Sequence, residues 1–115
     1  MASYETDYIL RMIRAAALAV ARMRERLMGG GNALEVVEAA QHAQQDLFGP
    51  RWQVISALDA ASAAQLIGDD RHVDAWTDLL LVEADAERVC GNDARAGRLE
   101  ARAAALRAAP TLRTS

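Results

Sequence analysis

Histidine and cysteine are scarce in this chain, which has two histidines and one cysteine, and this leaves few candidates for catalysis. His42 follows Glu38 by four residues, so a helix would place both side chains on one face. A di-iron bundle instead requires Glu-x-x-His pairs on facing helices, and the sequence contains no such pair. Glu38 and His42 are therefore interpreted as a solvated surface pair.

The densest group of potential cation ligands surrounds His72 and comprises Asp69, Asp70, Asp74 and Asp78. Carboxylate oxygens suit Ca²⁺ or Mg²⁺, and Asp74 and Asp78 would share a helical face. However, the spacing lacks the Asp-x-Asp-x-Asp-Gly order of an EF-hand loop. Acidic residues in a first helical turn are also favoured by the helix dipole alone. We predict neither a metal nor a cofactor, and cation binding by the Asp69–Asp78 run stays open.

No arrangement of nucleophile, base and oxyanion donor is recognisable, so no catalytic residue is predicted and the protein is expected to be non-enzymatic. Cys90 falls on or beside the apolar side of a predicted helix, near its end, and is expected to be a buried, inert thiol. Gly29–Gly31 lacks both a following Gly-Lys-Ser/Thr and a preceding strand, which makes it a linker. Trp52 and Trp76 are interpreted as core or interface anchors.

Length and charge bound the class of protein. A chain of 115 residues with 52% apolar and 25% charged residues is one globular domain. All thirteen basic residues are arginines, yet the net charge of −3 argues against a nucleic-acid partner, which needs a basic face. The first 28 residues carry five arginines against three acidic residues, so this segment could lie against the acidic remainder of the chain or against an acidic neighbour. Alanine supplies much of the apolar content, so the core is expected to bury little apolar area. Self-association is one way in which such a small domain can gain stability.

The sequence shows no membrane-spanning segment, because no apolar run approaches the ~18–20 residues needed. Residues 14–21 resemble the core of a signal peptide, but Glu5 and Asp7 precede them and the helical pattern continues past the cleavage point. A single cysteine suits a reducing compartment. We therefore predict a cytoplasmic protein.

The segment from Asp7 to Met28 carries the strongest pattern in the chain. Its apolar residues recur at alternating steps of four and three, which lines one helical face with a seam that must meet another helix. The seam, with Tyr8 and Met12 flanking it, is the predicted interaction face: Tyr8, Ile9, Met12, Ile13, Ala16, Val20, Met23 and Leu27. The pattern alone leaves open whether this seam is internal core or an interface.

Turn residues divide the rest into further helices. Asn32, with Glu35 as a capping box, begins the second helix, which ends at Gly49. After a loose turn, a third helix is predicted over 57–67, capped by Ser56 with Asp59. A fourth, opened by Asp69 or Asp70, runs to residue 90 with these residues facing inward: Val73, Trp76, Leu79, Leu80, Val82, Ala86 and Val89.

Asn92 or Asp93 opens the last helix, and Pro110 stops it. The small residues Ala86, Ala96 and Ala103 favour close packing of the last two helices as a tetratricopeptide-like hairpin. One hairpin is not a repeat array. The predicted fold is an all-α antiparallel bundle of four to five helices, with a single domain over 1–109 and a disordered tail over 110–115.

The heptapeptide Asp7-Tyr8-Ile9-Leu10-Arg11-Met12-Ile13 resembles the first-helix signature of an uncharacterised bacterial family of small all-helical proteins. Members of that family also resemble this chain in ending with a tetratricopeptide-like hairpin. The resemblance implies an all-helical fold, and it brings no assigned activity and no catalytic residues.

The function predicted from these observations is a protein-interaction or assembly module that buries its first helix against a partner. That partner is expected to be a second copy in a two-fold dimer or another helical protein. One alternative is a bundle that binds a small ligand or a metal through Glu38, His42, His72, Asp74 and Asp78. A further alternative is a peripheral membrane or scaffold-docking helix that uses Arg22, Arg24 and Arg26.

Overall fold

The structure, a computed structural model, describes residues 4–111. Along the chain it contains α1 (Tyr4–Met28), α2 (Ala33–Phe48), the 3-10 turn η1 (Gly49–Arg51), α3 (Trp52–Ala57), α4 (Ala60–Ile67), α5 (Asp70–Val89) and α6 (Asp93–Ala108). No strand occurs within the described residues, so the predicted all-α class is confirmed. Residues 1–3 of the predicted domain and 112–115 of the predicted tail lie outside them.

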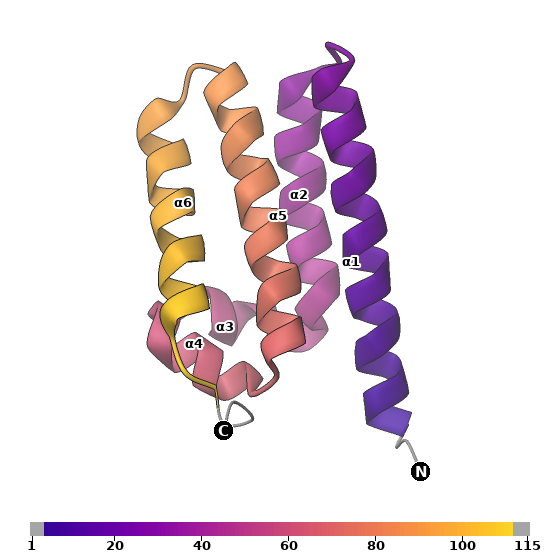
Figure 1. Cartoon of the computed structure of the whole chain (residues 1–115), viewed down its shortest axis with the longest axis vertical. Helices are drawn as coiled ribbons and strands as arrows, with labels where there is room; N and C mark the ends of the chain where they lie inside the picture. The colour runs from indigo at the N-terminus through magenta and orange to yellow at the C-terminus, as the bar shows by residue number, and fades with distance from the viewer. Residues whose placement is uncertain (1–3, 112–115) are drawn as a thin grey trace.

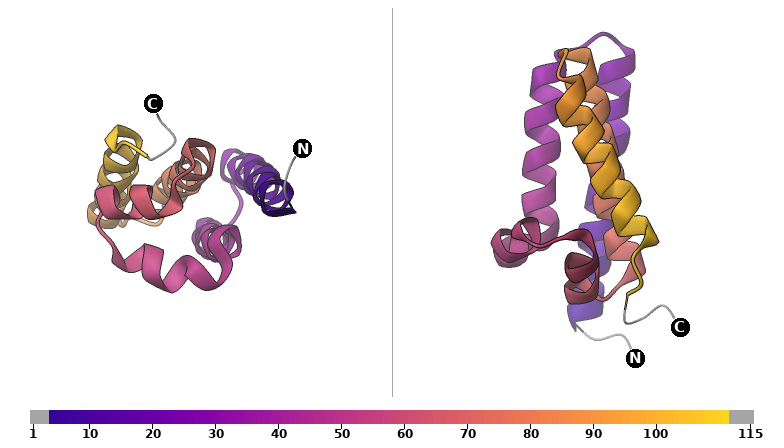
Figure 2. Two further views of the ribbon diagram at one scale, coloured as in Figure 1. Left: turned by 90° about the horizontal axis from the view of Figure 1, so that it is seen from below. Right: turned by 90° about the vertical axis from the view of Figure 1, so that its left-hand side faces the viewer.

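The four long helices stand side by side, and the two short ones lie across one end of the bundle (Figure 1). α1 and α2 form an antiparallel hairpin, as do α5 and α6. Because α3 and α4 return the chain along the end where α2 stops, α5 starts at the same end as α1, and the two run parallel. Seen from below in Figure 2, α6, α5 and α1 form a row, and α2 contacts α1 and α5 from one side.

The second helix begins as predicted, but only half of the expected capping box forms. The Asn32 side chain accepts hydrogen bonds from the backbone N–H of Leu34 and Glu35, at 3.0 and 3.3 Å. The Glu35 carboxylate does not return to the cap; it pairs with the Arg26 guanidinium at 2.6 Å. The carboxylate thereby links the end of α1 to the start of α2.

The predicted helix over 57–67 is wrong in its first residues. The chain is extended at Leu58 (φ −86°, ψ 154°), which ends α3, and α4 begins only after Asp59. Asp59, rather than Ser56, caps α4, since its side chain accepts from the Ser62 N–H at 3.2 Å. The predicted loose turn is in fact the helix α3. At the other end of α4, Gly68 adopts the left-handed conformation (φ 73°) that favours glycine.

The core runs between the four long helices and continues against the short ones. Its largest fully buried apolar side chains are Trp76, Ile55, Leu79, Leu106, Val36 and Val82. The Phe48 ring packs edge-on against Trp76 with their centroids 5.3 Å apart. The Arg102 guanidinium lies 4.9 Å from the Trp76 ring centroid and donates to the Leu58 carbonyl at 3.0 Å, so this residue joins α6 to the short helices.

Two predictions about the end of α5 are wrong. Val89, expected to face inward, is 68% exposed, and Cys90, expected to be buried, is also exposed. Val89 lies about 200° around the helix from the buried Glu87, and Cys90 follows the last helical residue of α5 as its C-cap, where the chain leaves the packed helix pair. The other predicted inward residues of α5 are buried.

Contacts continue past the predicted domain end at residue 109. Thr111 is buried, and its hydroxyl donates to the Asp70 carboxylate at 2.6 Å. In the described part of the chain, no helix has the combined length and hydropathy that a transmembrane segment requires.

Candidate functional site

The predicted interaction face of α1 is largely covered by the chain's own helices. Ala16 and Met23 are 5% and 4% exposed and belong to the core. Of the eight residues, Tyr8 alone is exposed, and the others are half-buried against the body: Ile9, Met12, Ile13, Val20 and Leu27. The seam thus serves as internal core against α2 and α5. A partner could reach only its edges while this packing holds.

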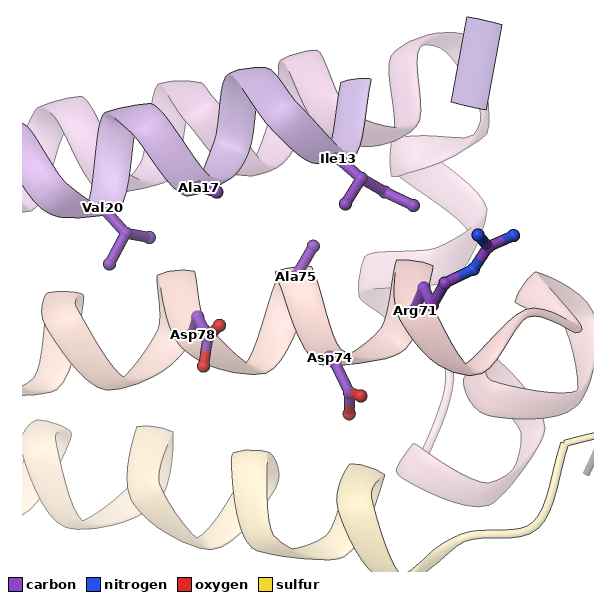
Figure 3. A pocket seen from close by; sticks show the side chains of 7 residues that line it. All are labelled: Ile13, Ala17, Val20, Arg71, Asp74, Ala75 and Asp78. Atoms are coloured by element: carbon purple, nitrogen blue, oxygen red, sulfur yellow. The ribbon is translucent and has the colours of Figure 1, made fainter. Parts of the chain in front are cut away.

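One of those edges lines a groove between α1 and α5, of about 180 Å³ (Figure 3). Its apolar walls are formed by Ile13, Ala17, Val20 and Ala75. Charged side chains from α5 border it: Arg71, Asp74 and Asp78. Since α2 covers the other side of the α1–α5 pair, the groove is the exposed junction of these two parallel helices.

A second apolar line runs along α1 beside this groove. We call it the outer line, and it comprises Leu10, Ala17, Ala21 and Met28. At 3.6 residues per turn these positions fall within about 40° of one another. Leu10 is half-buried, and the other three are exposed, Met28 to 88%. Leu18, 52% exposed, lies next to the line. The heptad pattern of the seam concealed this second line, because alanine contributes little to an apolar periodicity.

The charges on α1 divide into paired and unpaired arginines. Arg24 pairs with Asp85 of α5 at 3.0 Å, and Arg26 pairs with Glu35. Three exposed arginines of the outward face have no ion-pair partner in the part of the chain that the structure describes: Arg11, Arg14 and Arg22. Across the groove, the Asp74 carboxylate likewise lacks a partner within residues 4–111. The groove is therefore bordered by one unpaired carboxylate, that of Asp74, and lies next to a helix face with three unpaired arginines.

The residues of the predicted metal-site alternative do not converge. Glu38 and His42 are exposed on α2, whereas His72 is 3% exposed and its Nε2 donates to the Leu47 carbonyl at 3.1 Å. Asp74 and Asp78 lie on the far side of α5, about 200° and 240° around the helix from His72. Among the described residues, no group of three or more histidine, cysteine or acidic side chains could hold a metal ion.

Sequence reasoning missed a buried polar cluster between α2, α5 and α6. Glu83 is 2% exposed and is held by three donors. Its Oε1 accepts from Gln44 at 2.7 Å, and its Oε2 accepts from Gln41 at 3.2 Å and from Arg95 at 3.3 Å. Because a buried carboxylate is costly unless it is paired, these three contacts are what make Glu83 tolerable in the core.

Arg95 also reaches the next buried acid of α5. Its Nε donates to the Glu87 carboxylate at 2.6 Å, and Asn92 donates to the other oxygen of the same carboxylate at 2.9 Å. Asn92 therefore starts α6 without capping it through its side chain. One guanidinium thus serves two buried carboxylates, and it fixes α6 against α5.

The sequence does hold a signal for this cluster. Trp76, Glu83 and Glu87 recur at steps of seven and four, which puts them on one helical face. The Trp76 indole donates to Gln44 at 3.1 Å, which joins the aromatic core to the polar cluster. Both carboxylate oxygens of Glu83 and of Glu87 have a protein partner, so the contacts of the cluster hold α2, α5 and α6 together.

Comparison with protein-family models, with curated proteins and with solved structures finds no match to this chain. The family resemblance of Asp7–Ile13 accordingly stays a prediction. What the chain does has to be inferred from its own geometry.

Proposed function

We propose that the protein is a non-enzymatic assembly module that forms a two-fold dimer through α1. In this arrangement the outer line of each copy lies along the α1–α5 groove of the other. The observation that supports the proposal most directly is the second apolar line, because three of its four residues, Ala17, Ala21 and Met28, are exposed beside the groove. The sequence-based proposal is thereby moved from the seam to the adjacent face of the same helix.

Shape supports this pairing. Leu18 protrudes from α1, while Ala17 and Ala75 leave the groove shallow and wide enough for a side chain of that size. Small residues such as Ala17 and Ala21 let two helices approach to about 8 Å. α1 has 25 residues, a length of about 37 Å at 1.5 Å per residue, so it can run along the whole groove.

Charge supports the same partner. A second copy brings the unpaired Arg11, Arg14 and Arg22 of its α1 to a groove whose rim holds the unpaired Asp74. Two-fold symmetry makes every such contact occur twice, so modest contacts are doubled. An unrelated partner would have to supply a basic amphipathic helix, which this chain already contains.

The test is the mass in solution of the full chain and of Leu18→Asp, measured by light scattering after size exclusion. We expect the wild type at twice the 12.4 kDa of one chain and the variant at 12.4 kDa. Since Leu18 is exposed in the single chain, circular dichroism should show unchanged helicity for the variant.

Leu34→Asp is the matched control, because Leu34 is similarly exposed (57%) but lies on α2, away from the groove. It should remain dimeric. A wild type that is monomeric at the highest attainable concentration would reject the proposal. Co-sedimentation of such a monomer with anionic vesicles would instead assign the arginines of α1 to a membrane surface.

A further inference from the structure

A second hollow lies at the end of the bundle where the short helices cross. It has a volume of about 340 Å³ and is formed by the start of α1, the end of α2, η1, the end of α4 and the first turn of α5. We call it the end pocket. Its apolar lining residues are Ile9, Leu47, Phe48 and Ile67, and its polar ones are Tyr8, Arg51 and His72. A hollow of this size that combines apolar walls with a few polar groups can accommodate a small molecule.

His72 is the unusual group in this pocket. Its Nε2 lies 3.1 Å from the Leu47 carbonyl oxygen, which can only accept, so Nε2 carries the proton and Nδ1 carries a lone pair. Burial lowers the pKa of His72, which keeps the ring neutral. Nδ1 is buried and has no hydrogen-bond partner among the residues described. Since buried polar atoms are nearly always satisfied, this acceptor calls for a donor.

Arg51 supplies the charge. It is exposed in η1, and no ion pair within residues 4–111 engages it. Its guanidinium is close enough to His72 to contribute to the lowered pKa of that residue. A planar guanidinium suits a carboxylate, which it can bind through two parallel hydrogen bonds.

The apolar wall favours an aromatic ligand. The Phe48 ring lies 4.7 Å from the His72 ring and 5.3 Å from Trp76, centroid to centroid, and it stacks on Trp52 at 6.2 Å. A further ring entering the pocket would extend this cluster through edge or offset contacts. The aliphatic side chains of Ile9 and Ile67 line the same pocket.

We propose that the end pocket binds a small hydroxylated aromatic carboxylic acid. Its carboxylate pairs with Arg51, its ring packs on Phe48, and its hydroxyl donates to Nδ1 of His72. This site is independent of the α1–α5 groove, because the two hollows share no lining residue.

The test titrates the full chain with para-hydroxyphenylacetate by calorimetry and by tryptophan fluorescence. Both tryptophans of the chain pack on Phe48 or on each other, so fluorescence should report occupancy. Phenylacetate lacks the hydroxyl, and para-hydroxyphenethyl alcohol lacks the carboxylate. We expect the hydroxy acid to bind at least about tenfold more tightly than either, the loss of one hydrogen bond or ion pair.

Two variants separate the contacts. Arg51→Gln should weaken binding of the acid about tenfold and leave the alcohol unaffected, whereas Arg98→Gln, an exposed arginine of α6, should change neither. His72→Gln keeps a donor for Leu47 and should remove the preference for the hydroxylated acid over phenylacetate. Equal affinity for all three probes, no binding of the hydroxy acid, or undiminished binding by Arg51→Gln would overturn the proposal. The same titration is repeated with Leu18→Asp, which is expected to be monomeric. Ligand binding by this variant would show that the end pocket works without the proposed dimer.

Discussion

At the scale of single residues, His72 shows how burial changes what a side chain contributes. A histidine among aspartates suggested a cation site, yet the fold turns its ring inward, against Phe48 and the Leu47 carbonyl. Desolvation, the main cause, lowers its pKa from the ordinary value of 6.5, and the nearby Arg51 acts in the same direction. The Leu47 carbonyl and Asp69 oppose the shift without cancelling it. The ring is therefore neutral in the folded protein.

This environment predicts a pH-dependent stability. Below its ordinary pKa of 6.5, His72 takes up a proton in the unfolded chain but resists it in the folded one. The unfolded state then binds more protons, so the free energy of unfolding should fall as the pH drops below 6.5, until the folded pKa is reached. The slope can reach about 1.4 kcal/mol per pH unit.

Urea denaturation at several pH values measures that slope. His72→Gln should flatten it between neutral and mildly acidic pH. His42→Gln, on the exposed side of α2, leaves His72 in place and should retain it. An unchanged slope in His72→Gln would show that other groups cause the dependence.

At the scale of elements, the position of α6 depends on Arg95. α6 has few large apolar residues. The buried residues of this helix are Ala96, Ala103 and Leu106, of which only Leu106 is large. Arg95 joins it to Glu83 and Glu87 of α5, which are otherwise held by amide donors. The predicted hairpin of the last two helices therefore forms through small residues, as expected, together with a charged link that was not expected.

We expect Arg95→Met to destabilise the fold by about 2 kcal/mol, less than the loss of a fully buried partner because the arginine itself is half exposed. Two carboxylates would lose their charged donor. Arg98→Met on the same helix is the control and should change the free energy of unfolding little. Chemical denaturation monitored by circular dichroism provides both values. Equal effects in the two variants would show that the charged link contributes nothing.

At the scale of the whole molecule, an alanine-rich core and an exposed apolar helix face both favour the proposed dimerisation. Much of the core consists of alanine, and α1 exposes a second apolar line beside an open groove. Dimerisation would bury that line and add the contacts that the single chain lacks. The proposed two-fold arrangement would also place the unpaired arginines of α1 next to Asp74 of α5.

Mass action then predicts that the thermal midpoint rises with protein concentration, because binding of a second copy stabilises the folded state. Scanning calorimetry over a wide concentration range measures this effect. Leu18→Asp should give a midpoint independent of concentration, and Leu34→Asp should behave as the wild type. A constant midpoint in the wild type would indicate that the chain unfolds as a monomer.

The sequence by itself determined the helical class and most helix ends. Periodicity and capping are local, and Asn32 and Asp69 act on backbone within three residues of themselves. Local signals also identified the α1 seam as a buried face. They misplaced the start of α4, where two capping residues stood close together, and the exposure of Val89 and Cys90.

Only the tertiary structure decided what each face meets. Side-chain type does not tell which neighbour supplies a partner, and Glu83 and Glu87 are buried because α2 and α6 bring donors to their carboxylates. The groove beside Ala17 and the unpartnered Nδ1 of His72 also could not be predicted from side-chain type alone. Hollows and pairings arise between segments distant in the chain, so their positions depend on how the helices pack against one another.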